Sequence, residues 1–122
     1  MAPLFHARPT QENWHGLSIY EGDPVMDGDL RRLKYIPELK WLKIYPNSIA
    51  DTGIIHLQSL TQIEILILAS ESLTDHCLEY LFTLKTLRML DMQRASGVSR
   101  LAYDRAAAQL PLLRDVFPPF DK

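Results

Sequence analysis

The sequence of 122 residues holds very little cysteine and glycine. Cys77 is the only cysteine, which excludes an internal disulfide and fits a reducing compartment; we expect a buried structural thiol. The five glycines are scattered and form no phosphate-binding loop. The longest apolar run, Ile65 to Ala69, is far too short to cross a bilayer, and Met1 to Thr10 lacks the charged-then-apolar pattern of a secretory signal. The chain is therefore expected to be cytoplasmic, with no membrane partner.

The sequence also lacks a strong excess of charge of either sign, and it lacks catalytic motifs. The formal net charge is -2 and no basic stripe stands out, so nucleic acid is not an expected partner. The histidines, His6, His15, His56 and His76, have no second ligand type at metal-site spacing. Serine, histidine and acid form no nucleophile motif. We expect a protein that is not an enzyme and that needs no metal or cofactor.

What the sequence does contain is a repeat. A leucine-x-leucine phrase typical of a short strand returns at intervals of 25, 24 and 24 residues, and a partial fifth copy follows 26 residues later. The phrases are Leu17–Ile19, Leu42–Ile44, Leu66–Leu68 and Leu90–Met92, and the partial copy starts at Val116. Such a fixed period predicts stacked units of one kind.

Further columns keep the same register. Each unit continues with an apolar residue, then an acid, then apolar residues spaced by three as on a short helix, and then a linking apolar residue. The apolar columns are Val25, Ile49, Leu73, Val98; then Leu30, Leu33, Ile36; Ile54, Leu57, Leu60; Leu78, Leu81, Leu84; and the linkers Leu39, Ile63, Leu87, Leu113. The acids are Asp27, Asp51 and Asp75, which we interpret as helix N-caps rather than catalytic acids.

These phrases resemble the leucine-rich-repeat family. Ser48–Ile54 and Ser72–Leu78 look like its cysteine-containing subclass, and the resemblance extends from about Trp14 to Val116. It implies an α/β fold: a short solenoid of about four repeats plus caps, with parallel strands on the concave face and helices on the convex face. We expect one domain, with an N-terminal cap or tail over residues 1–13, repeats over 14–110 and a C-terminal cap over 111–122.

The last full copy departs from the pattern. Arg100 stands where the acid is expected, and Ser99 is predicted to cap a longer helix from Arg100 to Leu110, which Pro111 stops. Pro118 and Pro119 are expected to end the last strand, because proline cannot extend a ladder.

Side chains that alternate with the buried leucines should point away from the helices. They include one contiguous apolar group of the kind that marks interaction sites. The predicted partner-binding residues are Tyr20, Trp41, Lys43, Tyr45, Ile65, Ile67, Met89, Asp91 and Gln93, with Arg88 and Arg94 as further polar rim.

The sequence thus predicts a non-catalytic module that binds another protein on its sheet face, as an adaptor or a toxin-neutralising immunity-type protein. The alternative is a structural assembly factor or obligate subunit whose apolar face is permanently covered. The apolar face could also be covered by a terminal tail, Leu4-Phe5 or Phe117 to Phe120, or by a second copy of the chain in a homodimer.

Overall fold

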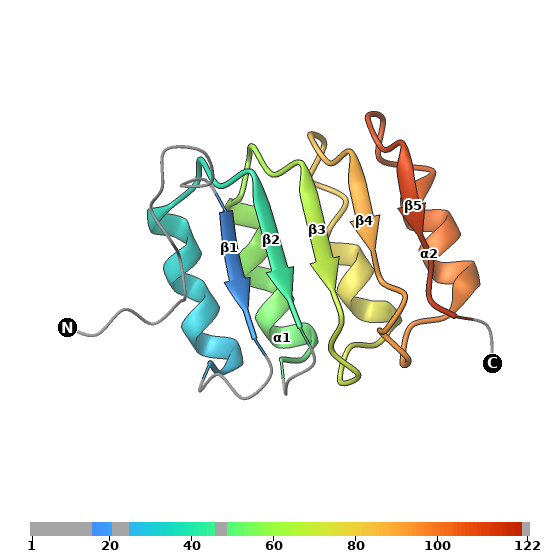
Figure 1. Ribbon diagram of the computed structural model, residues 1–122, viewed down its shortest axis with the longest axis horizontal. Coiled ribbons are helices and arrows are strands. Elements are labelled where there is room, and N and C mark those ends of the chain that lie inside the picture. The colour runs from blue at the N-terminus through green and yellow to red at the C-terminus, as the bar shows by residue number, and fades with distance from the viewer. Residues whose placement is uncertain (1–15, 21–24, 46–48, 121–122) are drawn as a thin grey trace.

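The protein is a mixed α/β fold around one parallel sheet, as the computed structural model shows for residues 16–20, 25–45 and 49–120 (Figure 1). The strands are β1 (Gly16–Ile19), β2 (Trp41–Ile44), β3 (Ile65–Leu68), β4 (Met89–Asp91) and β5 (Asp115–Phe117). The helical segments are η1 (Asp27–Tyr35), α1 (Asp51–Ile54), which continues into η2 (Ile55–Ser59), η3 (Asp75–Tyr80) and α2 (Arg100–Ala107). The five strands lie side by side in chain order and are all parallel.

The molecule has two layers. Each of the strands β1 to β4 is followed by a helical segment that returns the chain to the start of the next strand, and these segments cover one face of the sheet (Figure 1). No helix in the described ranges lies on the other face, which we call the outer sheet face. None of the helices found in the described ranges has the length and apolar character needed to span a membrane.

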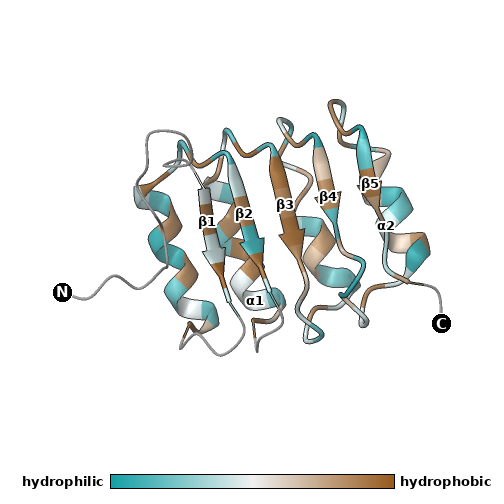
Figure 2. Ribbon diagram, viewed as in Figure 1, coloured by the Kyte–Doolittle hydropathy of each residue, from teal (hydrophilic) through white to brown (hydrophobic). Residues whose placement is uncertain are grey.

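The strands pair in the register that the repeat predicts. Leu42 lies beside Leu17 and Leu66 in the sheet, and Leu66 lies beside Leu90. Leu42, Leu66 and Leu90 have no exposed surface and belong to the core between sheet and helices. The predicted assignment of inward-facing residues is therefore confirmed. Figure 2 shows β3 hydrophobic along its whole length, which means that it presents apolar side chains to the core and to the outer face alike.

The helical segments are tighter than an ordinary α-helix. Segments η1, η2 and η3 are 3-10 helices, and only α1 and α2 are α-helical. Side chains three residues apart align in a 3-10 helix, and Leu30 and Leu33 of η1, both fully buried, point together into the core in this way. The three-residue spacing therefore favours this geometry over the 3.6-residue turn.

The repeated acids do not cap their own helices, so that prediction was wrong. Asp51 is the first residue of α1, and its carboxylate accepts hydrogen bonds from the backbone N–H of Thr74, 2.8 Å away, and from the Thr74 hydroxyl. Asp27 accepts in the same way from the Ala50 N–H and the Thr52 hydroxyl. Asp75 accepts from the N–H and hydroxyl of Ser99. Each acid thus ties one unit to the next.

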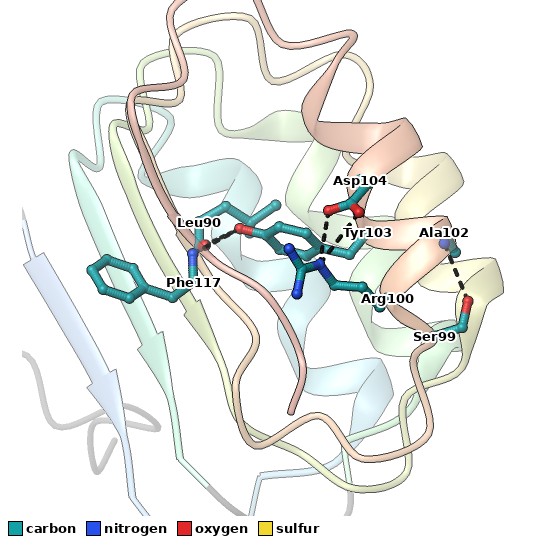
Figure 3. A network of polar contacts seen from close by, with 7 residues as sticks. All are labelled: Leu90, Ser99, Arg100, Ala102, Tyr103, Asp104 and Phe117. Carbon is teal, nitrogen blue, oxygen red and sulfur yellow. Dashed lines mark hydrogen bonds and ion pairs between the residues drawn. The ribbon is translucent and has the colours of Figure 1, made fainter. Parts of the chain in front are cut away.

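At η3 and α2 the cap is a hydroxyl residue instead, whereas the N-cap residues of η1 and α1, Met26 and Ala50, make no side-chain cap hydrogen bond. The Thr74 side chain accepts from the His76 N–H at the start of η3. Ser99 accepts from the Ala102 N–H at the start of α2, as predicted (Figure 3). Helix α2 ends at Ala107, three residues before the predicted end, so Pro111 is not its direct stop. Arg100 forms an ion pair with Asp104 one turn along.

A buried tyrosine joins the last two strands. The Tyr103 hydroxyl donates to the Leu90 carbonyl at 2.6 Å and accepts from the Phe117 N–H at 3.0 Å, so it bridges β4 and β5 (Figure 3). Burial raises the pKa of Tyr103 to about 12. Strand β5 ends at Phe117, directly before Pro118, as predicted. Its inward residue Val116 is half exposed, because no further unit in the described chain covers this edge.

The inter-unit role of Asp51 gives a first prediction. Asp51→Ala removes the acceptor for the N–H and hydroxyl of Thr74 and should lower the free energy of unfolding by about 1–3 kcal/mol. Asp104→Ala is the matched control, because among the described residues this acid pairs with Arg100 on the surface, and its loss should cost under about 1 kcal/mol. Urea denaturation of both variants measures the difference, and equal costs would contradict the assigned role.

The buried thiol of Cys77 and the buried phenol of Tyr103 predict that the protein loses stability at alkaline pH. Burial raises the pKa of Cys77 from 9.0 to about 12 and that of Tyr103 from 10.0 to about 12. The unfolded chain therefore releases these protons first, and the free energy of unfolding should fall as pH rises from 9 to 12. Denaturant titrations at each pH measure this. Cys77→Ala should flatten the fall between pH 9 and 10, where Tyr103 stays protonated in the folded state and is at most half ionised in the unfolded chain; an unchanged profile would contradict the assignment.

Candidate functional site: the outer sheet face

The outer sheet face consists of side chains in three columns that run across the strands. In the first column Gly16, Trp41, Ile65, Met89 and Asp115 are register partners, and in the second Ser18, Lys43, Ile67, Asp91 and Phe117 are. Tyr20, Tyr45, Ala69 and Gln93 follow at the carboxyl ends of the strands. The structure therefore brings all nine predicted residues onto one face. Tyr20 is 50% exposed; the other eight are half-buried, since neighbours on adjacent strands cover their flanks.

Trp41 anchors the amino-terminal side of the face. A Cβ atom placed on Gly16 would lie 1.5 Å from Cε2 of the Trp41 ring, so the indole occupies the space that a side chain at position 16 would need. The Lys43 ammonium lies 5.1 Å from the centroid of the same ring, in a cation–π contact. This part of the face is aromatic, with a single positive charge resting on it.

Two tyrosines extend the aromatic surface at the carboxyl ends of β1 and β2. The rings of Tyr20 and Tyr45 are stacked, with centroids 5.4 Å apart and planes 2° from parallel. Ala69, the next residue in this column, is almost fully buried. Neighbouring residues cover this small side chain, so Ala69 adds little exposed apolar surface to the column.

The centre and the carboxyl-terminal side differ in chemistry. Ile65 and Ile67 supply the two outward side chains of β3, and Met89 continues the apolar surface on β4. Asp91 follows in the Lys43 column, and its carboxylate accepts the Gln93 N–H at 3.0 Å. An apolar centre thus lies between a positive side chain on β2 and a negative one on β4.

A row of charged side chains borders the face just before the strands begin. Of this row, the sequence predicted only Arg88 as part of the site. Glu64 lies 3.6 Å from the Lys40 ammonium and 3.7 Å from the Arg88 guanidinium. A shallow hollow of about 130 Å³ opens here, with Gln62, Thr86 and Leu112 also in its wall. Because the residue before each of β2 to β5 is charged in the sequence, this column could have been found from the repeat alone.

Residues with reactive groups do not gather on this face. Cys77 is fully buried in the core, as predicted, and the nearby carboxylates of Asp51 and Asp75 add to the effect of burial in raising its pKa to about 12. Such a thiol stays protonated at neutral pH and is a poor nucleophile. Within the ranges 16–20, 25–45 and 49–120, no three His, Cys, Asp or Glu residues are grouped so that they could hold a metal ion.

Two terminal segments, Leu4-Phe5 and Phe117 to Phe120, were candidates to cover the apolar part of the outer sheet face. Phe117 lies in β5 and pairs with Asp91, and the Phe120 N–H donates to the Gln93 carbonyl at 3.4 Å. The segment from Phe117 to Phe120 therefore lies beside β4 and not over Trp41 or Ile65 on β2 and β3. Leu4-Phe5 lies outside the described residues.

The close approach of Trp41 to Gly16 gives a prediction. Gly16→Ala should displace the indole and lower the free energy of unfolding by about 1–3 kcal/mol, as overpacking does. Gly28→Ala is the control, since a Cβ there meets nothing within 4 Å. Tryptophan emission in a Trp14→Phe background should shift to the red only for Gly16→Ala; unchanged emission would show that Trp41 does not depend on this space.

Comparison with known proteins adds no family to this geometry. No protein-family model and no curated protein matches the sequence of this chain. The outer sheet face is therefore interpreted from the contacts of its own residues: an apolar centre with aromatic anchors, flanked by Lys43 on one side and Asp91 on the other.

Proposed function

We propose that this chain is a short leucine-rich-repeat solenoid that binds another protein on its outer sheet face. The repeated units, the chain-order parallel sheet and the helices on one face all support such a solenoid, with about four repeats plus caps. The protein acts by binding, as an adaptor or as an immunity-type protein that neutralises a toxin, without catalysis or a cofactor.

The observation that carries this proposal is the apolar centre of a face that no described helix covers. Trp41, Ile65, Ile67 and Met89 are contiguous through the strand register. A sheet face turned to water normally carries polar side chains. Tryptophan and methionine, by contrast, are enriched at the centres of protein interfaces. Tyr20 and Gln93 lie at the border of this group, where a polar rim is expected.

The alternative function is an assembly factor or an obligate subunit whose outer face is permanently covered. The same apolar centre supports it, since obligate interfaces are the more hydrophobic kind. The two functions differ in the free state of the protein: a transient binder is isolated without its partner, and an obligate subunit is isolated with it.

Partner capture by outer-face variants tests the proposal. Ile65→Asp places an unpaired charge at the centre of the interface and should weaken binding of the host partner at least about tenfold. Gln58→Asp is the matched control, because Gln58 is exposed on η2, on the opposite side of the molecule. Affinity capture from the host, quantified by mass spectrometry, measures the difference.

Circular dichroism establishes that both variants are folded, and Ile67→Asn serves as a second outer-face variant if Ile65→Asp is not. A partner lost with Gln58→Asp but kept with the folded outer-face variant would place the binding surface on the helices and overturn the proposal.

A further inference from the structure

The outer sheet face is self-complementary about its central strand. Lys43 on β2 and Asp91 on β4 are both register partners of Ile67 on β3, so they lie one strand away from it on opposite sides. Trp41 and Met89 are placed in the same way about Ile65. A half turn about an axis along β3 therefore exchanges a positive position with a negative one, and a large rigid side chain with a flexible one.

We propose that the outer sheet face binds a second copy of this chain, with a two-fold axis close to the direction of β3. This rests on the proposed function, because it names the partner of the same surface. Face to face, β3 of one copy crosses β3 of the other, with Ile65 and Ile67 meeting their own counterparts at the axis. Aligned sheets pack about 10 Å apart at roughly 30°, which a small tilt of the axis provides.

The charges select this axis over the other in-plane choice. With the axis along β3, Lys43 of each copy faces Asp91 of the other, giving two opposite-charge pairs from one contact. With the axis across the strands at the height of Lys43 and Asp91, β2 would lie over β2 and Lys43 would face Lys43, while Asp91 would face Asp91. Like charges brought together in an interface weaken it strongly, so these two residues favour the axis along β3.

The apolar contacts agree with the same axis. By strand position Trp41 of each copy lies opposite Met89 of the other, while the indole itself leans over Gly16 on β1. A flexible thioether that reaches the edge of an aromatic ring makes a favourable contact. Trp41 is held in place over Gly16 and under Lys43, so it loses little freedom on binding. Met89 is flexible and adapts to the rigid ring. The face thus pairs an ordered anchor with an adaptable surface.

Like charges meet only outside the apolar centre. In this arrangement Lys40 of one copy approaches Arg88 of the other at the start of the strands, and Glu64 approaches Glu64. Glu64 already bridges Lys40 and Arg88 within each copy, so the row contains both signs in alternation. These side chains are more than a third exposed, and water and salt screen their repulsion.

The size of the face sets the strength of the dimer. Five strands about 4.8 Å apart and three columns of side chains give roughly 400–500 Å² per copy, or about 800–1,000 Å² in total. Stable complexes bury about 1,200–2,000 Å², so we expect a reversible dimer with a dissociation constant in the micromolar range. A heterologous partner then competes with self-pairing for one surface.

A charge-exchange experiment tests the proposal. Sedimentation equilibrium of the full chain should show a monomer–dimer equilibrium. Concentrations from about 10 to about 500 µM cover the dissociation constant expected for a small interface. Lys43→Glu and Asp91→Lys alone should each weaken dimerisation at least about tenfold, because each creates like-charge pairs. An equimolar mixture of the two variants restores both opposite-charge pairs and should form a heterodimer about as tight as the wild-type dimer.

Other outcomes overturn the proposal. A wild-type chain that stays monomeric across the range, or a mixture no tighter than the single variants, shows that the face does not bind a second copy in this arrangement. Thermal melts monitor folding of both variants, and Arg31→Glu, an exposed change on η1, is the control expected to leave dimerisation unchanged. Loss of host-partner capture by Ile65→Asp in a strictly monomeric protein would keep the proposed function and remove only the self-pairing.

Discussion

The near-constant spacing of the strands is the constraint on which the rest of this structure depends. Each unit of 24 or 25 residues returns the chain to the same position along the strand direction. As a result, Leu17, Leu42, Leu66 and Leu90 lie in one row across the sheet. A shift of one residue in any strand would move its leucines to the outer face and its outward side chains into the core. The core and the outer face are therefore two consequences of one register.

Contacts between units complete what a single unit cannot achieve. One strand and one short 3-10 helix cannot bury their own apolar sides, so neighbouring units supply the missing surface. The aspartate bridges from Asp27, Asp51 and Asp75 add polar contacts across the same junctions. The series ends at Arg100, and beyond it Tyr103 bridges the last pair of strands. The final junction is thus held by a buried phenol bridging two strands.

The outer face shows how one backbone pattern acquires a specific surface. Its positions are equivalent in every unit, yet the side chains change from Trp41 and Lys43 on β2 to Met89 and Asp91 on β4. Because the core positions keep leucine-like residues, outward positions other than the tightly packed Gly16 can vary without disturbing the core. Chemical asymmetry across a repeated scaffold produces the self-complementary arrangement that we propose, and the same surface serves any other protein that fits it.

The sequence by itself determined the strands, their order, the buried columns and the membership of the outer face, because these follow from a period that is visible in the residues. It also located the Ser99 cap and the end of β5 at Pro118. The tertiary structure alone decided the partners of Asp51, the seat of Trp41 on Gly16 and the place of Phe117 at the sheet edge. Alternation is a property of one strand, whereas these contacts join atoms of different units and depend on side-chain torsions and distances that no periodic pattern encodes.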